Sequence, residues 1–266
     1  MGRQLNIGFV NIMPNVCSYE ALIKQALSPV QSHIVLHPIR LMSHKYASSG
    51  ADIDLYDSFA AVLARVDLDL LIITGAPVED KPFDAIHYWQ ELSEMMTYAS
   101  KHIRSVMGIC FGGLAIARHL GVNKRILSQK MYGVYPMTLH SGSERYFPEQ
   151  AESFQLPMST WALLDKVDLA QSDIRVLASH PAIGEMVLES PDRRFFMLLG
   201  HPEYTIETLQ QEWMRDVNKG LAYTEHYDLE SFVEMQQKME TGACPLIVHW
   251  VRSHMDRASG DSGCQC

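Results

Sequence analysis

Gly-Ile-Cys-Phe-Gly-Gly, at residues 108–113, decides the fold, because it places one cysteine between a buried strand and a helix. Residues 104–109 are predicted as the strand, and residues 114–120 have helical spacing. The glycines allow a sharp turn, and the helix amino terminus offers backbone N–H groups and a positive dipole that favour a thiolate and an oxyanion. Cys110 is therefore a candidate covalent catalyst, and a buried cysteine that only packs is the alternative.

A second motif follows another short apolar stretch. Residues 195–199 are predicted as a strand, which delivers Gly-His-Pro-Glu-Tyr at residues 200–204. A thiol catalyst needs a base and a group that orients the base, and residues two apart at a strand end point the same way. A lone histidine is usually a surface or core residue. Beside an elbow and an acid, however, His201 becomes a candidate base, with Glu203 as its orienting partner.

Strand and helix patterns alternate along the first half of the chain, which predicts a mostly parallel α/β sheet with helices on both faces. Ligands of such sheets bind outside the carboxyl ends of the strands, where both motifs lie. The predicted strands are 5–13, 34–41, 68–74 and 105–109, and the predicted helices are 19–27, 56–66, 84–102 and 114–120.

The second half of the chain departs from this alternation. Residues 130–137 and 174–199 contain shorter strands with turn residues between them, which predicts an antiparallel extension or edge of the sheet. Helices are predicted over 205–218, 229–239 and 245–254. Without a linker or an internal repeat, we expect a single domain over residues 1–258 and a disordered tail over residues 259–266.

The composition is that of a globular enzyme, with 266 residues, 47% hydrophobic and 20% charged. A net charge of −9 disfavours nucleic acid or an anionic membrane as the main partner. No apolar run reaches the roughly 20 residues of a membrane span. The run at residues 5–13 is too short for a signal peptide. We therefore expect a cytoplasmic protein that acts on small molecules.

The five cysteines are an odd number without framework spacing, which is typical of a reducing compartment. Cys264 and Cys266 lie in the Gly/Ser/Asp-rich tail, where no further ligand is close enough to complete a tetrahedral metal site. We expect no metal site and no bound cofactor. Association into a homodimer is left open.

Four further short motifs stand in order with the elbow and the His-Pro-Glu stretch. Together the six motifs resemble the homoserine O-acyltransferases of the homoserine transsuccinylase type, over residues 5–220, as a shortened and divergent member. The resemblance implies the flavodoxin-like fold of class I glutamine amidotransferases. The four motifs are Asn-Ile-Met-Pro at 11–14, Thr-Gly-Ala-Pro-Val-Glu at 74–79, Tyr-Trp at 88–89 and Gly-Val-Tyr at 133–135.

This resemblance implies a ping-pong reaction through a thioester on Cys110, which takes an acyl group from acyl-CoA and yields it to an amino-acid hydroxyl. His201 would deprotonate first the thiol and then the acceptor, with Glu203 orienting the imidazole. The oxyanion would contact the N–H of Phe111 and an N–H of the loop over residues 75–79, which contains Gly75 and Ala76.

Glu79 bears on the choice of acyl group. In the family, glycine at the matching place goes with succinyl-CoA and glutamate with acetyl-CoA. A carboxylate there fills the room that a succinyl tail needs and repels its charge. Taken alone, Glu79 is a solvated loop acid. With the resemblance, it predicts acetyl-CoA as the co-substrate.

Four residues match or stand near family positions around the acceptor amino acid: Arg215, Glu212, Lys130 and Ser159. The Arg215 guanidinium would hold the acceptor carboxylate. Apart from the resemblance, Arg215 and Glu212 form an ordinary exposed i, i+3 ion pair, and Lys130 is a solvated lysine.

Two departures from the family pattern leave the acceptor open. Residues 157–160 read Pro-Met-Ser-Thr where the family usually has Pro-His-Ser-Arg, and Asn15 and Val16 replace a lysine pair. L-homoserine, L-serine or a less usual hydroxy amino acid could accept the acyl group. Two other classes compete: a glutaminase subunit that uses the same triad, and a non-enzymatic sensor whose cysteine is oxidised.

Overall fold

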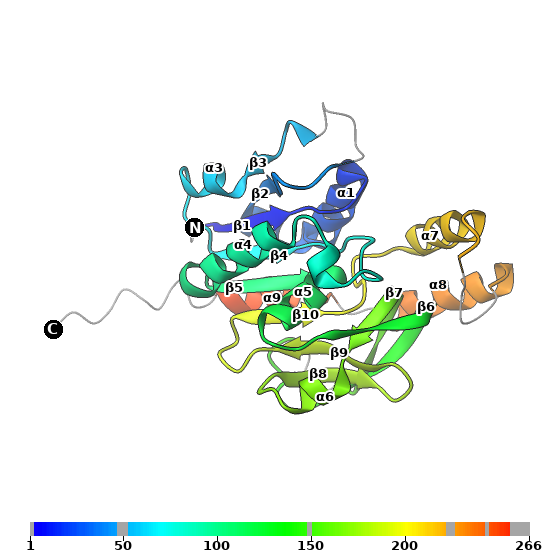
Figure 1. Cartoon of the computed structure of the whole chain (residues 1–266). Helices are drawn as coiled ribbons and strands as arrows, with labels where there is room; N and C mark the ends of the chain where they lie inside the picture. The colour runs from blue at the N-terminus through cyan, green and yellow to red at the C-terminus, as the bar shows by residue number, and fades with distance from the viewer. Residues whose placement is uncertain (1–2, 47–52, 148–150, 222–226, 243–244, 256–266) are drawn as a thin grey trace.

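The computed structural model describes residues 3–46, 53–147, 151–221, 227–242 and 245–255. Its described strands form a ten-stranded sheet in the order β3-β2-β1-β4-β5-β10-β9-β8-β6-β7. The sheet changes character at β10 (Phe195–Leu198), which pairs in parallel with β5 (Ser105–Ile109) and antiparallel with β9 (Gly184–Glu189). This junction divides a parallel half from an antiparallel half (Figure 1).

The parallel half is the centre of the hydrophobic core. Every residue of β4, β5 and β10 is buried, as expected for parallel strands covered on both faces. This arrangement confirms the predicted α/β fold. Its remaining strands are β1 (Leu5–Val10), β2 (Ile34–Arg40), β3 (Asp57–Ser58) and β4 (Leu70–Ile73).

Helices cover the parallel half from both sides, with α4 in front of the sheet and α9 behind it (Figure 1). The indole N–H of Trp250 in α9 donates to Ser105 Oγ at 3.2 Å and ties this helix to β5. The helical elements of this half are α1 (Val16–Ala26), the 3-10 segments Ser28–His33 and Phe83–Ala85, α3 (Phe59–Leu63), α4 (Trp89–His102), α5 (Phe111–His119) and α9 (Leu246–Met255).

The antiparallel half confirms the predicted extension of the sheet. Long β6 pairs with β7 along most of its length, and β8 joins β6 to β9. Helices α7 and α8 lie beside β6 and β7 at this edge of the sheet (Figure 1), where the Tyr132 O–H of β6 donates to the Leu209 carbonyl of α7. The elements of this half not yet bounded are β6 (Lys124–Leu139), β7 (Ser153–Leu164), α6 (Lys166–Ala170), β8 (Arg175–His180), α7 (Ile206–Asn218) and α8 (Leu229–Gly242).

Strand β7 was not predicted from the sequence, because its Pro-Met-Ser-Thr stretch lacks a strand pattern. Its register nevertheless places Pro157 opposite Val134 and Ser159 opposite Tyr132. Proline is tolerated there because β7 is an edge strand, whose outer N–H groups need no ladder partner. The strand predicted over 130–137 is part of the longer β6, which begins at Lys124. Its pairing register with β7 shifts between Ile126 and Met131.

Four predicted helices begin at other residues than expected, and the first of them, predicted over 19–27, is α1, which begins already at Val16. The helix over 56–66 shortens to α3, because the short strand β3 precedes it and Ser58 caps it. The helix over 84–102 begins only at Trp89, after a separate 3-10 turn. The helix after the elbow begins at Phe111, three residues earlier than expected, because the turn is completed at Cys110.

Within the described ranges, no helix is both long and apolar enough to pass through a membrane. The predicted tail over 259–266, with Cys264 and Cys266, lies outside the described residues. Among the described residues, Cys17 and Cys110 form no disulfide bond, and the first is exposed and the second buried. The single-domain assignment stays a prediction.

Candidate active site

The turn that carries Cys110 is strained in the way a nucleophile elbow requires. Cys110 has φ 50° and ψ −112° and immediately precedes α5. Non-glycine residues rarely adopt a positive φ, and the strain persists only because the surroundings hold it. A Cβ at Gly108 would lie 2.3 Å from the backbone of Gly112, and one at Gly112 would lie 2.3 Å from the Ile73 carbonyl oxygen. Glycine at both positions is therefore required for the close approach of the turn to the sheet.

His201 reaches the elbow because β10 lies next to β5 in the sheet. The Cys110 N–H donates to the Leu198 carbonyl at 2.7 Å, which joins the ends of the two strands. The backbone of His201 is held from the other side, since its N–H donates to the Pro157 carbonyl in β7 at 2.8 Å. Its ring nitrogen Nδ1 lies 2.8 Å from Glu203 Oε1, and both side chains are buried. The predicted His–Glu pair is therefore present.

Cys110 and His201 are electrostatically coupled. Burial raises the pKa of the Cys110 thiol, and the nearby His201 opposes this rise, partly through a side-chain hydrogen bond. Burial lowers the pKa of His201, but the negative charges of the Cys110 thiolate and of Glu203 outweigh burial and raise it overall. A buried thiol beside a strengthened base favours transfer of the proton to His201 when the sulfur attacks.

The loop after β4 covers the cysteine and the histidine. A Cβ at Gly75 would lie 3.4 Å from Cys110 Cβ and 3.5 Å from His201 Cε1, and the next residue, Ala76, is buried. Phe111 is the first residue of α5, where helix geometry leaves the backbone N–H without an intrahelical acceptor. The loop and the helix amino terminus that were predicted to hold the oxyanion thus both lie beside Cys110.

Glu79 is not a solvated loop acid, because only 5% of it is exposed. Burial raises the pKa of Glu79, while Lys130 and His201 oppose the rise and Glu212 adds to it. Its Oε2 has no hydrogen-bond partner among the described residues. The carboxyl group therefore lies inside the site, with titratable neighbours from β6, α7 and the loop after β10.

The four residues predicted around the acceptor lie together. Lys130 Nζ lies 4.0 Å from Glu212 Oε2, the Ser159 hydroxyl donates to the same oxygen, and Arg215 Nη1 lies 3.5 Å from Glu212 Oε1. Burial raises the pKa of Glu212, but Lys130 and His201 outweigh burial and lower it overall. The expectation of a solvated lysine is wrong, since the side chain of Lys130 is 4% exposed. The i, i+3 ion pair is present, with Arg215 at its exposed end (42%) and Glu212 at its buried end (13%).

Asp216 was missed by the sequence analysis, although it belongs to this cluster. Its side chain is 2% exposed, and it lies 2.6 Å from Lys130 Nζ and 2.8 Å from Arg215 Nε. One acid therefore holds both cations. Its only sequence signal was its place next to Arg215.

Tyr204 and Lys124 were also missed. The Tyr204 ring stacks on His201, with ring centroids 3.9 Å apart, and its O–H donates to Glu212 Oε1 at 3.0 Å. Lys124 Nζ lies 4.4 Å from the Phe83 ring centroid, and burial lowers the pKa of Lys124 to about 8 while Glu79, Asp80 and Cys110 oppose the shift.

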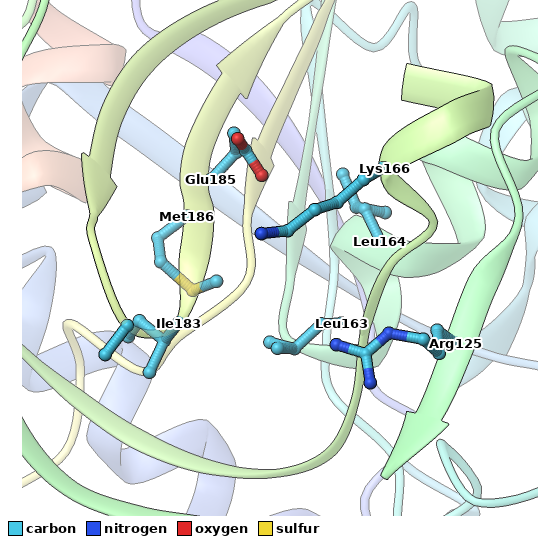
Figure 2. A pocket seen from close by; sticks show the side chains of 8 residues that line it. Arg125, Leu163, Leu164, Lys166, Ile183, Glu185 and Met186 are labelled. Carbon is cyan, nitrogen blue, oxygen red and sulfur yellow. The ribbon is translucent and has the colours of Figure 1, made fainter. Parts of the chain in front are cut away.

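Two hollows in the antiparallel half are separate from this site. The smaller one lies between β7, α6 and β9, and Figure 2 shows Lys166 extending across it toward Glu185. Its volume of about 30 Å³ suits water rather than a substrate. The larger one, about 450 Å³, lies at the carboxyl end of β6 beside His140 and Phe147. Neither hollow is lined by a residue of the predicted triad.

Solved structures resemble this fold at low sequence identity. A glutamine amidotransferase from Thermotoga maritima superposes with a TM-score of 0.62 and 11% identity, over 97% of this chain and 100% of that chain. A glutamine amido transferase from Methylobacillus flagellatus gives a TM-score of 0.63 and 12% identity, over 95% and 96% of the two chains. These likenesses confirm the class I glutamine amidotransferase-like fold and carry nothing beyond it.

Sequence relatives are more specific. The homoserine O-acetyltransferase of Jannaschia sp. (strain CCS1) is 32% identical over 222 residues, which are 82% of this chain and 71% of the relative. The homoserine O-acetyltransferase of Petrotoga mobilis is 33% identical over 223 residues, 82% of this chain and 72% of the relative. A family model described as homoserine O-succinyltransferase matches residues 1–254. The chain therefore belongs to the homoserine O-succinyltransferase family, a family of homoserine O-acyltransferases.

Proposed function

We propose that this chain is an acyl-CoA-dependent homoserine O-acetyltransferase that works through a thioester on Cys110. The observation that carries the proposal is the buried His201–Glu203 pair beside a strained cysteine elbow, in a chain of this family. A thiol, a base and a carboxylate that orients the base are the groups needed for covalent acyl transfer.

In the first half-reaction, His201 accepts the Cys110 S–H proton as the sulfur attacks the thioester carbonyl of acetyl-CoA. The negative charge that forms on the carbonyl oxygen is stabilised by the Phe111 N–H and by an N–H of the Gly75–Ala76 loop. The carbon–sulfur bond to coenzyme A then breaks, and His201 returns the proton to the departing thiolate.

In the second half-reaction, the hydroxyl of the acceptor amino acid loses its proton to His201 and attacks the acyl-Cys110 carbonyl. Cys110 leaves as a thiolate and recovers the proton from His201, which completes the cycle without net proton change. Arg215 would pair with the carboxylate of the acceptor and Glu212 with its ammonium group. Lys130 and Ser159 hold Glu212 in place.

Acetyl rather than succinyl transfer is supported by Glu79, since a buried carboxylate beside the nucleophile leaves neither room nor favourable charge for a second carboxylate. Both relatives named above are homoserine O-acetyltransferases. L-homoserine is therefore the first acceptor to test, with L-serine, one methylene shorter, as the second.

Intact-mass measurement after mixing the protein with acetyl-CoA tests the proposal. We expect a gain of about 42 Da on the wild type, its loss on addition of L-homoserine, and no gain in Cys110→Ala. Succinyl-CoA and L-glutamine serve as parallel donors. Labelling by glutamine with release of ammonia, and none by acetyl-CoA, would replace acyl transfer by the glutaminase alternative.

A further inference from the structure

The Asn-Ile-Met-Pro stretch after β1 determines where α1 begins. The buried side chain of Asn11 donates from Nδ2 to the Val16 carbonyl at 2.9 Å. The Ile12 N–H donates to Thr74 Oγ1 at 2.8 Å, which ties the same turn to the end of β4. Asn15, which replaces one lysine of the family pair, caps α1 by accepting from the Ser18 N–H at 3.3 Å. Helix α1 is therefore held at its first turn from both sides.

This placement carries Tyr19 into the active site. Tyr19 lies in the first turns of α1 on its buried face and is 2% exposed. Its O–H donates to Glu203 Oε1 at 2.6 Å, across 184 positions of the sequence. The Glu203 carboxylate is thus contacted from a helix that carries no residue of the predicted triad.

The two donors to Glu203 share one oxygen. His201 Nδ1 lies 2.8 Å from Oε1, the oxygen that also accepts from Tyr19. A carboxylate can only accept, so Nδ1 carries the proton and leaves Nε2 as the basic nitrogen of the ring. Glu203 Oε2 is buried without a hydrogen-bond partner among the described residues. Within that part of the chain, Tyr19 is the hydrogen-bond donor that restrains Glu203 independently of the base.

We propose that Tyr19 is a positioning residue of the active site, which holds Glu203 through its phenol and thereby fixes His201 against Cys110. Its role in turnover rests on the proposed acyl-transfer function, whereas its effect on the reactivity of the Cys110 sulfur does not. Burial raises the pKa of Tyr19 well above its ordinary value, and Glu203 adds to the rise, so the phenol stays a donor throughout the assay range.

Removal of the phenol changes the charge that His201 meets. The Tyr19 O–H withdraws negative charge from Glu203 Oε1, so Tyr19→Phe leaves the full carboxylate charge facing the imidazole and raises the pKa of His201. Tyr19 also lies near Cys110, Glu212 and Tyr204, but as a neutral phenol it presents no net charge to them. The titratable groups that face His201 from the surrounding elements are Cys110, Glu79, Glu203, Tyr204 and Glu212.

The experiment follows the rate at which iodoacetamide alkylates Cys110 between about pH 5 and pH 9.5, by mass mapping of the Cys110 peptide because Cys17 is exposed. In Tyr19→Phe we expect the acidic side of the profile of alkylation rate against pH, its acid limb, to move to higher pH by roughly 0.5 to 1 unit. The acid limb of kcat/KM should move with it, and kcat/KM at the optimum should fall about 10-fold.

Tyr146→Phe is the matched control. Tyr146 is also a fully buried tyrosine whose O–H donates to a buried glutamate, Glu189, toward the other end of β10 and away from His201. Tyr146→Phe should lose about as much stability as Tyr19→Phe, and the acid limbs of its alkylation and kcat/KM profiles should stay unchanged. 3-Fluorotyrosine placed at position 19 keeps the shape of the side chain and strengthens the donor, so it should move the acid limb downward even if Tyr19→Phe folds poorly.

The inference is overturned if the Tyr19→Phe profiles superimpose on those of the wild type, or if Tyr146→Phe shifts equally. Failure of the proposed function would look different. In that case the wild type would not be acylated by acyl-CoA, while its Cys110 alkylation profile would still respond to Tyr19→Phe.

Discussion

Replacement of Glu79 by glycine should open the acyl pocket to succinyl-CoA. A succinyl carboxylate bound about 5 Å from the Glu79 carboxylate, at an effective dielectric constant of about 20, would be repelled by about 3 kcal/mol. That energy corresponds to roughly 200-fold in kcat/KM, before any gain from the space that the side chain vacates. We therefore expect the acetyl-to-succinyl preference of Glu79→Gly to fall by about two orders of magnitude.

Glu79→Gln separates charge from space, since glutamine keeps the volume and loses the negative charge. Initial rates with both acyl-CoA donors at saturating acceptor give the preference of each variant. In the wild type, succinyl-CoA use should rise as pH falls toward the raised pKa of Glu79, because the carboxylate then becomes neutral. This pH dependence should vanish in both variants. An unchanged preference in Glu79→Gly would refute the assignment of Glu79, and a wild-type preference in Glu79→Gln would refute the role of its charge.

Three further substitutions probe the elbow, the acceptor cluster and Lys124. Gly112→Ala should lower the free energy of unfolding by about 3 kcal/mol and remove most of the activity, because the new Cβ meets the Ile73 carbonyl. The control Gly121→Ala, which has open space but a φ of 94°, should lower the free energy of unfolding by about 1 kcal/mol. Equal losses in thermal unfolding would contradict the close approach at Gly112. Arg215→Ala should raise the KM of the acceptor about 10-fold or more and leave the rate of Cys110 acetylation unchanged in single-turnover mass measurements; slower acetylation would refute its role. Lys124→Met should raise the melting temperature at pH 7, because the wild-type fold must hold a charged amine whose pKa burial lowers from 10.5 to about 8. The gain in stability over the wild type should disappear as pH rises from about 8 through 10.5, where the folded wild type loses the charge before the unfolded chain does. A gain that is constant with pH would contradict the lowered pKa.

The sequence predicted the meeting of Cys110 and His201 because each follows a strand of the parallel sheet. Two buried strands of a parallel sheet have their carboxyl ends at the same edge, as β5 and β10 do. The motifs that follow these strands are then enough to place a thiol, a base and an acid at that edge. The motif also predicted Glu79 near the nucleophile, and its charge is close enough to raise the pKa of Cys110. Its burial, however, comes from the way other elements close over the loop, which no local pattern encodes.

Other parts of the site could not be read in this way because their partners are distant in the chain. The Tyr19–Glu203 bond spans 184 positions and depends on the exact start of α1. Asp216 belongs to the cluster because it pairs with Lys130, a residue of β6 that lies 86 positions earlier in the sequence. Strand β7 escaped prediction because its pattern is set by its long pairing with β6 and by its edge position, both of which are tertiary features.

The position of β10 is suited to the two half-reactions of the proposed function. Its parallel partner β5 presents Cys110, and the antiparallel half on its other side contributes Lys130 from β6 and Ser159 from β7. His201 follows β10 directly, and its backbone is bonded to Pro157 of β7 while its ring faces Cys110. A base held between the nucleophile and the acceptor cluster can take a proton from the thiol in one step and from the acceptor hydroxyl in the next without leaving its place. In the proposed reaction the antiparallel extension therefore does more than lengthen the sheet, because Lys130 and Ser159 would form the side of the site against which the acceptor binds.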